Sequence, residues 1–258
     1  MSQVDVPLVR AGFGQTRRAD NWWVQPLFVF LGLSTFIVYS TWAALQGQHF
    51  RFGPYLSPFY SPELFGSSDA WFGANPAWMP AWVTAAMLIL WAPGGFRVTC
   101  YYYRGAYYKA FWADPPSCTV GEPRKKYLGE RSFPLIIQNI HRYFLYLALV
   151  FLVILARDVW NAIWFDGHFG IGFGTLVLLT NLILLTSYTF GCHSFRHLVG
   201  GFRDRLAGRP VRKLAYDCVS CFNRRHMLFA WCSLFSVGFA DLYIRLCSMG
   251  IWHDWRIL

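Results

Sequence analysis

The sequence predicts an all-α integral membrane protein with five transmembrane helices, and three observations support this fold class. Hydrophobic residues make up 55% of the 258 residues and charged residues only 14%, whereas about a quarter of the residues in soluble domains are charged. Several apolar segments approach the roughly 20 residues that a helix needs to cross a bilayer. Lysine and arginine gather in alternate connections between these segments, as they do in multi-pass membrane proteins.

The predicted spans divide the chain into three parts. A polar segment, residues 1–25, precedes a membrane domain of residues 26–250, and residues 251–258 form a short tail. The expected spans cover residues 26–46, 77–96, 134–156, 170–192 and 227–250. The second span is the least regular, because it contains Pro80 and ends in Pro93-Gly94-Gly95, and both residue types interrupt helices.

The distribution of basic residues predicts the orientation of the chain. Lys and Arg concentrate in residues 1–25, 97–133 and 194–226, and the connections on the other side carry few. Cytoplasmic loops carry the excess of positive charge. We therefore expect a cytoplasmic amino terminus and a carboxyl terminus outside.

The net charge of +10 would favour nucleic-acid binding in a soluble protein. Here the basic residues lie in loops between spans, so we interpret them as topology determinants and as contacts for anionic lipid or a soluble partner. We expect no nucleic-acid partner. The parts outside the spans are too small for an active site of their own, so soluble chemistry is expected to belong to a partner subunit.

Cysteine and histidine residues gather where the chain leaves the membrane on the predicted cytoplasmic side. This group comprises Cys100, Cys118, His141, Cys192, His193, His197, Cys218, Cys221 and His226. Thiolates and imidazoles are ligands for iron, zinc and copper, so the distribution predicts a metal centre assembled from separate helix ends. His141 is the most specific signal, because an ionisable residue inside a span is costly and usually faces a cofactor, pore or partner. An imidazole bonded to a neighbouring carbonyl is the structural alternative.

Several kinds of protein remain open on the residues alone. Two cysteines and two histidines from different helices could bind a Rieske-type [2Fe-2S] cluster. A pair such as His141 with His193 could instead ligate a single haem b, and the lack of a second pair near the outer face disfavours two haems. A transporter or lipid-binding protein would use the cysteines only for packing. A thiol oxidoreductase would place them on the oxidising side, opposite to the predicted one.

Aromatic and basic residues alternate in the stretch FRVTCYYYRGAYYKAFWADPPSC, residues 96–118. An interfacial aromatic belt explains this composition. Tyrosine hydroxyls and an arginine at the membrane edge could also hydrogen-bond a quinone carbonyl and stabilise charge as it is reduced. Tyr101, Arg104 and Tyr107 are the candidate quinone contacts.

Four strings carry a resemblance to a known family: FRVTCYYYRGAYYKAFWADPPSC, NIHRYFLYLALVFLVILARD, LLTSYTFGCHSFRHLVGG and CFNRRHMLFAWCSLFSVGFADLYIRL. They resemble the membrane-anchor subunit of succinate dehydrogenase, respiratory complex II, in its single-chain, five-helix class that holds a Rieske-type cluster. The resemblance covers about residues 20–250. It implies a multi-pass protein of the bacterial inner membrane that assembles with a flavoprotein and an iron-sulfur subunit and passes electrons to quinone. A higher oligomer is compatible with this assembly.

Carried onto this chain, the resemblance also implies a set of metal ligands. His141 and His193 become the expected imidazole ligands, and the two thiolates are expected from among Cys100, Cys118 and Cys221. Further candidates in reserve are Cys218, His197 and His226. One haem b in an anchor of a related quinone-linked dehydrogenase remains the alternative.

Overall fold

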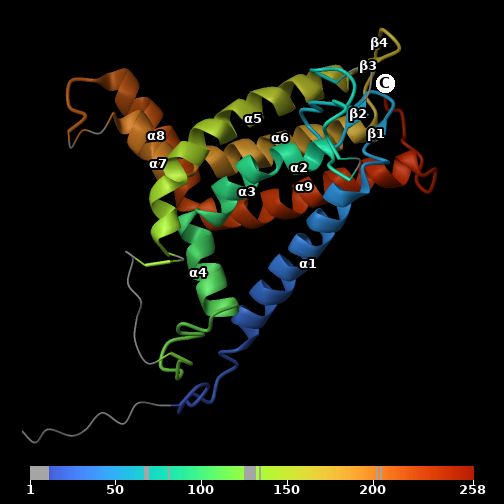
Figure 1. The fold of residues 1–258 in the computed structure, drawn as a ribbon. Coiled ribbons are helices and arrows are strands. Elements are labelled where there is room, and N and C mark those ends of the chain that lie inside the picture. Colours follow the sequence, from blue (N-terminus) through green and yellow to red (C-terminus); the bar gives the residue numbers. More distant parts are fainter. Residues whose placement is uncertain are drawn as a thin grey trace, which may run out of the picture. The chain divides into compact units, whose positions relative to one another are not determined.

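A computed structural model describes residues 12–66, 70–80, 82–124, 132–133, 135–201, 203 and 205–258, with only the backbone of Arg104 and Leu135. The described part is mostly helical (Figure 1). Its helices are α1 Val24–Gln46, α2 Ala85–Ile89, α3 Trp91–Val98, α4 Tyr101–Ala110, the 3-10 helix η1 Leu135–Ile140, α5 His141–Asn161, α6 Phe173–Phe190, α7 His193–Gly200, α8 Pro210–Arg224 and α9 His226–Ser248. Strands β1 Arg51–Phe52 and β2 Tyr55–Leu56 form one antiparallel hairpin, and β3 Trp164–Phe165 and β4 His168–Phe169 form another.

Among the described residues, four helical segments have the length and apolar character of a membrane span. They are α1, the continuous stretch Ile136–Asn161 of η1 and α5, α6 and α9, with mean hydropathies of 1.7, 1.9, 1.6 and 1.6. Helices of this length are required because a lipid environment offers no other partner for the backbone hydrogen-bonding groups. The structure thus agrees with the predicted all-α membrane class and with four of its expected spans.

The second predicted span differs from the expectation of one long helix. Its described residues form turns up to Thr84, which caps α2 by accepting a hydrogen bond from the Met87 amide at 3.3 Å. Leu90 then ends α2 and begins α3, and Pro93 lies in the first turn of α3, where its missing amide hydrogen is tolerated. Residues 85–98 together reach about 21 Å at 1.5 Å per residue, which is less than the hydrocarbon thickness of roughly 30 Å.

The chain divides into two compact units. In the first, residues 1–35 and 101–138, the segment before α1 is tied to the loop after α4. Gly14 donates its amide hydrogen to the Gly121 carbonyl at 2.9 Å. Arg18 donates to the Ser117 hydroxyl at 2.8 Å and to the Cys118 carbonyl at 3.0 Å.

The second unit, residues 36–100 and 139–258, is a helix bundle. Helix α6 packs against both α5 and α9, and α3 packs against α5. At one end lie both β-hairpins and the C-terminal tail, and we call this the hairpin end. There Asp254 accepts hydrogen bonds from the hydroxyls of Tyr55 at 2.8 Å and Tyr243 at 2.6 Å, and from the Gly174 amide at 2.9 Å. The tail thereby caps the first turn of α6 with a carboxylate, which the helix dipole favours.

A buried ion pair joins α9 to the loop that contains β1 and β2. Asp241 and Arg245 are 0% and 1% exposed and lie 3.4 Å apart, one turn apart on α9. Asp241 also accepts hydrogen bonds from Tyr39 and Ser57, and Arg245 donates to the Gln48 carbonyl at 2.8 Å. Because both charges are fully hydrogen-bonded, they hold the loop on the bundle rather than forming an open polar path.

Candidate metal and quinone site

Two cysteine–histidine pairs meet at the opposite end of the bundle, which we call the cysteine end. Cys100 follows α3, His141 begins α5, Cys192 lies between α6 and α7, and His226 begins α9. The His141 Nε2 atom lies 3.0 Å from the Cys192 sulfur, and the His226 Nε2 atom lies 3.4 Å from the Cys100 sulfur. The fold therefore joins thiols and imidazoles that are up to 126 positions apart in the sequence.

The two pairs form one buried cluster. Cys100, Cys192 and His141 are 3%, 2% and 8% exposed. The Cys100 and Cys192 thiols also interact electrostatically. The two imidazoles, of His141 and His226, also interact electrostatically. We call Cys100, His141, Cys192 and His226 the Cys/His cluster.

A hydrogen bond to Thr99 determines which nitrogen of His141 faces the cysteine. The Thr99 hydroxyl donates its one hydrogen to the Gly95 carbonyl at 2.7 Å. Its oxygen lies 2.8 Å from His141 Nδ1, so it must accept the Nδ1 hydrogen. The Nε2 atom then presents a lone pair toward Cys192, which is the arrangement that metal-ligating histidines require.

Aromatic rings cover the faces of both imidazoles. Phe96 stacks on His141 with ring centroids 4.7 Å apart, and Tyr188 stacks on His226 at 5.0 Å. The two aromatic rings meet edge to face at 5.5 Å. The Arg97 guanidinium lies 4.7 Å from the centre of the Tyr188 ring. The two aromatic rings thus cover the imidazoles, and Arg97 places a cation next to the ring that stacks on His226.

The Cys/His cluster contains two thiols and two imidazoles, which are potential metal ligands. Among the described residues, no group of three or more His, Cys, Asp or Glu side chains is placed to hold a metal ion. A Rieske-type cluster needs two thiolates on one iron and two imidazoles on the other, so Cys100 with Cys192 and His141 with His226 are the pairs that such a centre would require. The buried Nδ1 of His226 has no hydrogen-bond partner within the described ranges. The other ring nitrogen, Nε2, contacts the Cys100 sulfur.

Only part of the predicted ligand set lies in this cluster. Cys100 and His141 are members, and His226 joins them from the reserve candidates. Cys192 belongs to the predicted cysteine and histidine group but was not among the expected ligands, although it ends the fourth predicted span. The signal in the sequence was that Cys100 and Cys192 both lie at or near the end of a predicted span.

The other predicted ligands lie elsewhere. On α7, His193 places its Nε2 3.0 Å from that of His197, and burial together with His197 lowers the pKa of His193. Cys218 and Cys221 are exposed on α8. Cys118 is exposed in the first unit. Within the second unit, the structure does not bring His193 or Cys221 into the Cys/His cluster.

The predicted quinone contacts lie on α4. Tyr101 is exposed and Tyr107 is partly buried, and the side chain of Arg104 is outside the described part of the chain. Separately, the second unit contains an apolar cavity of about 170 Å³ beside the Cys/His cluster. Its walls include Phe96 and Tyr188, the two rings that cover the imidazoles, together with Arg97.

Comparison with known proteins places these features in a family. Residues 24–250 match the model of the family described as actinobacterial succinate dehydrogenase subunit SdhC. A chain in the structure described as the Mycobacterium smegmatis Sdh1 complex in the apo form is 40% identical, with a TM-score of 0.88 and coverage of 97% of both chains. A search of curated proteins finds no match.

Proposed function

Because the chain belongs to the family of actinobacterial succinate dehydrogenase SdhC subunits, we propose that its Cys/His cluster holds a Rieske-type [2Fe-2S] centre beside a quinone-binding cavity. As an SdhC subunit, the chain is part of an oxidoreductase and works with flavoprotein and iron-sulfur subunits. It is a multi-pass protein of the bacterial inner membrane. The proposal concerns what this membrane subunit binds.

The observation that carries the proposal is the pairing of each imidazole Nε2 with a cysteine sulfur. Cys100 and Cys192 would hold the centre through sulfur, and His141 and His226 would hold it through Nε2. Such a centre supplies a one-electron carrier whose histidine ligation raises its reduction potential. Thr99 orients the His141 ring, and Phe96 and Tyr188 exclude water from the imidazole faces.

The haem alternative has less support from the same geometry. Axial ligation of one haem by two histidines needs two Nε2 atoms that face each other across the iron. In the cluster each Nε2 faces a sulfur atom instead. The donor chemistry therefore favours iron-sulfur ligation, and an optical spectrum distinguishes the two.

We place the quinone in the apolar cavity of the second unit. Its wall residue Arg97 donates to the Ala230 carbonyl at 3.2 Å and to the Ser233 hydroxyl at 2.9 Å, so the guanidinium is held in place. A fixed cation beside the cavity stabilises negative charge that develops on a quinone oxygen. The expected contacts Tyr101, Arg104 and Tyr107 on α4 remain the alternative surface.

The same proposal includes the orientation of the chain. The hairpin end would face the outside and the cysteine end the cytoplasm, in line with the basic loops. Helix α1 ends at the hairpin end, and α3 ends at Val98, two residues before Cys100 in the cysteine end. The segment with α2 and α3 would thus make the remaining crossing, partly as non-helical chain, and give five crossings with the amino terminus inside.

The test is low-temperature EPR of the purified, dithionite-reduced complex, with an optical spectrum and an assay of iron and acid-labile sulfide. The variants are His141→Ala, His226→Ala and Cys192→Ser, and the matched controls are His193→Ala and Cys221→Ser. We expect a signal of low average g value that the three cluster variants lose and the two controls retain.

Two results would overturn the proposal. A Soret band in the wild type that disappears in His141→Ala would identify haem. Loss of the signal in His193→Ala or Cys221→Ser, with retention in His226→Ala and Cys192→Ser, would assign the ligands to the sequence-derived set instead.

A further inference from the structure

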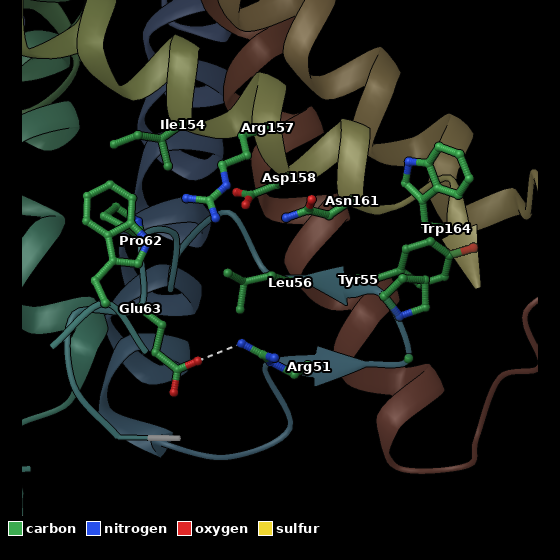
Figure 2. Close-up of a pocket in the computed structure, with 13 residues that line it drawn as sticks. Arg51, Tyr55, Leu56, Pro62, Glu63, Ile154, Arg157, Asp158, Asn161 and Trp164 are labelled. Atoms are coloured by element: carbon green, nitrogen blue, oxygen red, sulfur yellow. Dashed lines mark hydrogen bonds and ion pairs between the residues drawn. The ribbon is translucent and has the colours of Figure 1, made fainter. Parts of the chain in front are cut away.

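A second pocket, of about 550 Å³, lies at the hairpin end. Its lining is polar and includes no residue of the Cys/His cluster. Figure 2 shows Arg157, Asp158 and Asn161 of α5 on one side and Arg51, Tyr55 and Leu56 of the first hairpin on the other. Trp71 and Trp164 also line it. Tryptophan is enriched where a protein meets the headgroup region of a bilayer.

The pocket contains charges of both signs. Arg51 forms an ion pair with Glu63 at 2.9 Å (Figure 2). Asp158 accepts a hydrogen bond from Ser61. Arg157 is exposed and makes no hydrogen bond or ion pair with any part of the chain that the structure describes. Two basic and two acidic side chains thus line the pocket, so it suits a ligand that carries one negative and one positive charge.

Below the pocket, the exposed face of α5 is apolar. Arg157 continues a row of exposed residues at helical spacing, Tyr146, Val150 and Val153, and Val153 is 72% exposed. Residues three and four apart lie on one face of a helix. The row from position 146 to position 157 is about 16 Å long, which is comparable to an extended acyl chain.

From these two features we propose that the hairpin-end pocket binds one phospholipid of the aminophospholipid class, such as phosphatidylethanolamine. Arg157 binds the phosphate, because an arginine guanidinium forms charge-assisted hydrogen bonds with phosphate oxygens. Asp158 faces the ammonium group. Asn161 donates to the headgroup oxygens, and the acyl chains lie along Val153 and Val150.

The proposal is independent of the redox centre. In the proposed orientation the lipid belongs to the outer leaflet, and it would fill the space between α5 and the hairpin loop that Asp241 and Arg245 hold on the bundle. Its role is to complete the packing of that loop at the membrane surface.

The experiment compares lipid retention and stability in the whole complex. The wild type, Arg157→Gln and the control Lys213→Gln are purified in mild detergent, and bound lipids are counted by native mass spectrometry. Lys213 is an exposed basic residue on α8, so its substitution matches the charge change away from the pocket. We expect about tenfold lower retention of phosphatidylethanolamine in Arg157→Gln only.

A second measurement adds phosphatidylethanolamine, phosphatidylglycerol or inorganic phosphate to delipidated complex and follows the thermal midpoint. Phosphatidylethanolamine is expected to raise the midpoint of the wild type but not of Arg157→Gln. Asn161→Leu, which keeps both arginines, is expected to weaken the effect.

Each contrary outcome overturns the proposal. Equal retention in the wild type and Arg157→Gln would remove the lipid site. A full response to inorganic phosphate would indicate a site for free anions, and a response only to phosphatidylglycerol would contradict the zwitterionic headgroup. The EPR signal is expected in Arg157→Gln as in the wild type, so failure here is distinct from failure of the redox proposal.

Discussion

The orientation of the His141 ring depends on one hydroxyl group. Thr99 donates to the Gly95 carbonyl and therefore accepts from His141 Nδ1. This relay places the unprotonated nitrogen toward Cys192 and prevents the ring from turning. Partners of this kind commonly change metal affinity or activity by about 10–100-fold when they are removed.

We predict that Thr99→Val, which keeps the side-chain volume, lowers the [2Fe-2S] content or quinone reduction of the complex about tenfold or more. Thr99→Ser retains the hydroxyl and is expected to restore both. The measurement is the EPR signal per flavin together with its g values, which a general packing defect would leave unshifted. Identical spectra and content in Thr99→Val and the wild type would contradict the orienting role.

A second prediction concerns the buried pair on α9. Asp241→Asn leaves the Arg245 charge buried without its carboxylate, and we expect a loss of about 3–5 kcal/mol in stability. The exposed Asp217→Asn on α8 is the control and is expected to change stability by less than about 0.5 kcal/mol. Thermal unfolding of the complex in detergent measures both. Equal midpoints would show that the pair does not stabilise the loop.

Among the helices, the contact of α3 with α5 decides how the cluster is assembled. A Cβ atom added at Gly95 would lie 2.2 Å from the Phe144 ring, whereas one added at Gly94 meets nothing within 4 Å. The absence of a side chain at position 95 lets α3 approach α5 closely. That approach brings the Thr99 hydroxyl within reach of His141.

The adjacent glycines provide a matched pair of variants. Gly95→Ala is expected to destabilise the complex by about 1–3 kcal/mol through overpacking and to reduce the cluster content, because α3 must shift away from His141. Gly94→Ala is expected to be neutral or slightly stabilising, since alanine favours the helix. Thermal unfolding and the EPR signal test the pair, and similar effects of the two substitutions would refute the explanation.

For the entire molecule, the separation of the hairpin end from the cysteine end is the feature that topology experiments can test. Three exposed cysteines, Cys118, Cys218 and Cys221, lie in segments predicted to be cytoplasmic. The exposed His168 lies on the β3–β4 hairpin, which is predicted to face outside. A membrane-impermeant thiol reagent therefore distinguishes the two sides.

We predict that intact cells with His168→Cys are labelled on this subunit by an impermeant maleimide, whereas wild-type cells are not. Permeabilised cells or inverted vesicles are expected to label the wild type at its native cysteines. Labelling of the wild type from outside would reverse the proposed orientation.

Much of the architecture follows from local sequence patterns. Long apolar runs must form helices in a membrane, because no other structure pairs every backbone group there, and four predicted spans occur as helices near their expected positions. The run at residues 77–96 is also apolar, but its described residues form turns up to Thr84 and then two short helices, with Gly94 and Gly95 inside the second helix. The sequence showed that this segment is apolar, but it did not show where its turns and short helices would lie.

The sequence alone also predicted a group of thiols and imidazoles near the ends of the apolar segments, with His141 among them. The choice of partners depended on distances between helix ends, which no spacing along the chain encodes. Cys192 faces His141 and His226 faces Cys100 because α6 packs against both α5 and α9, and α3 packs against α5. His193, only one position from Cys192, lies on the next helix and faces His197 instead, because a turn of the backbone at the end of α6 directs the two side chains apart.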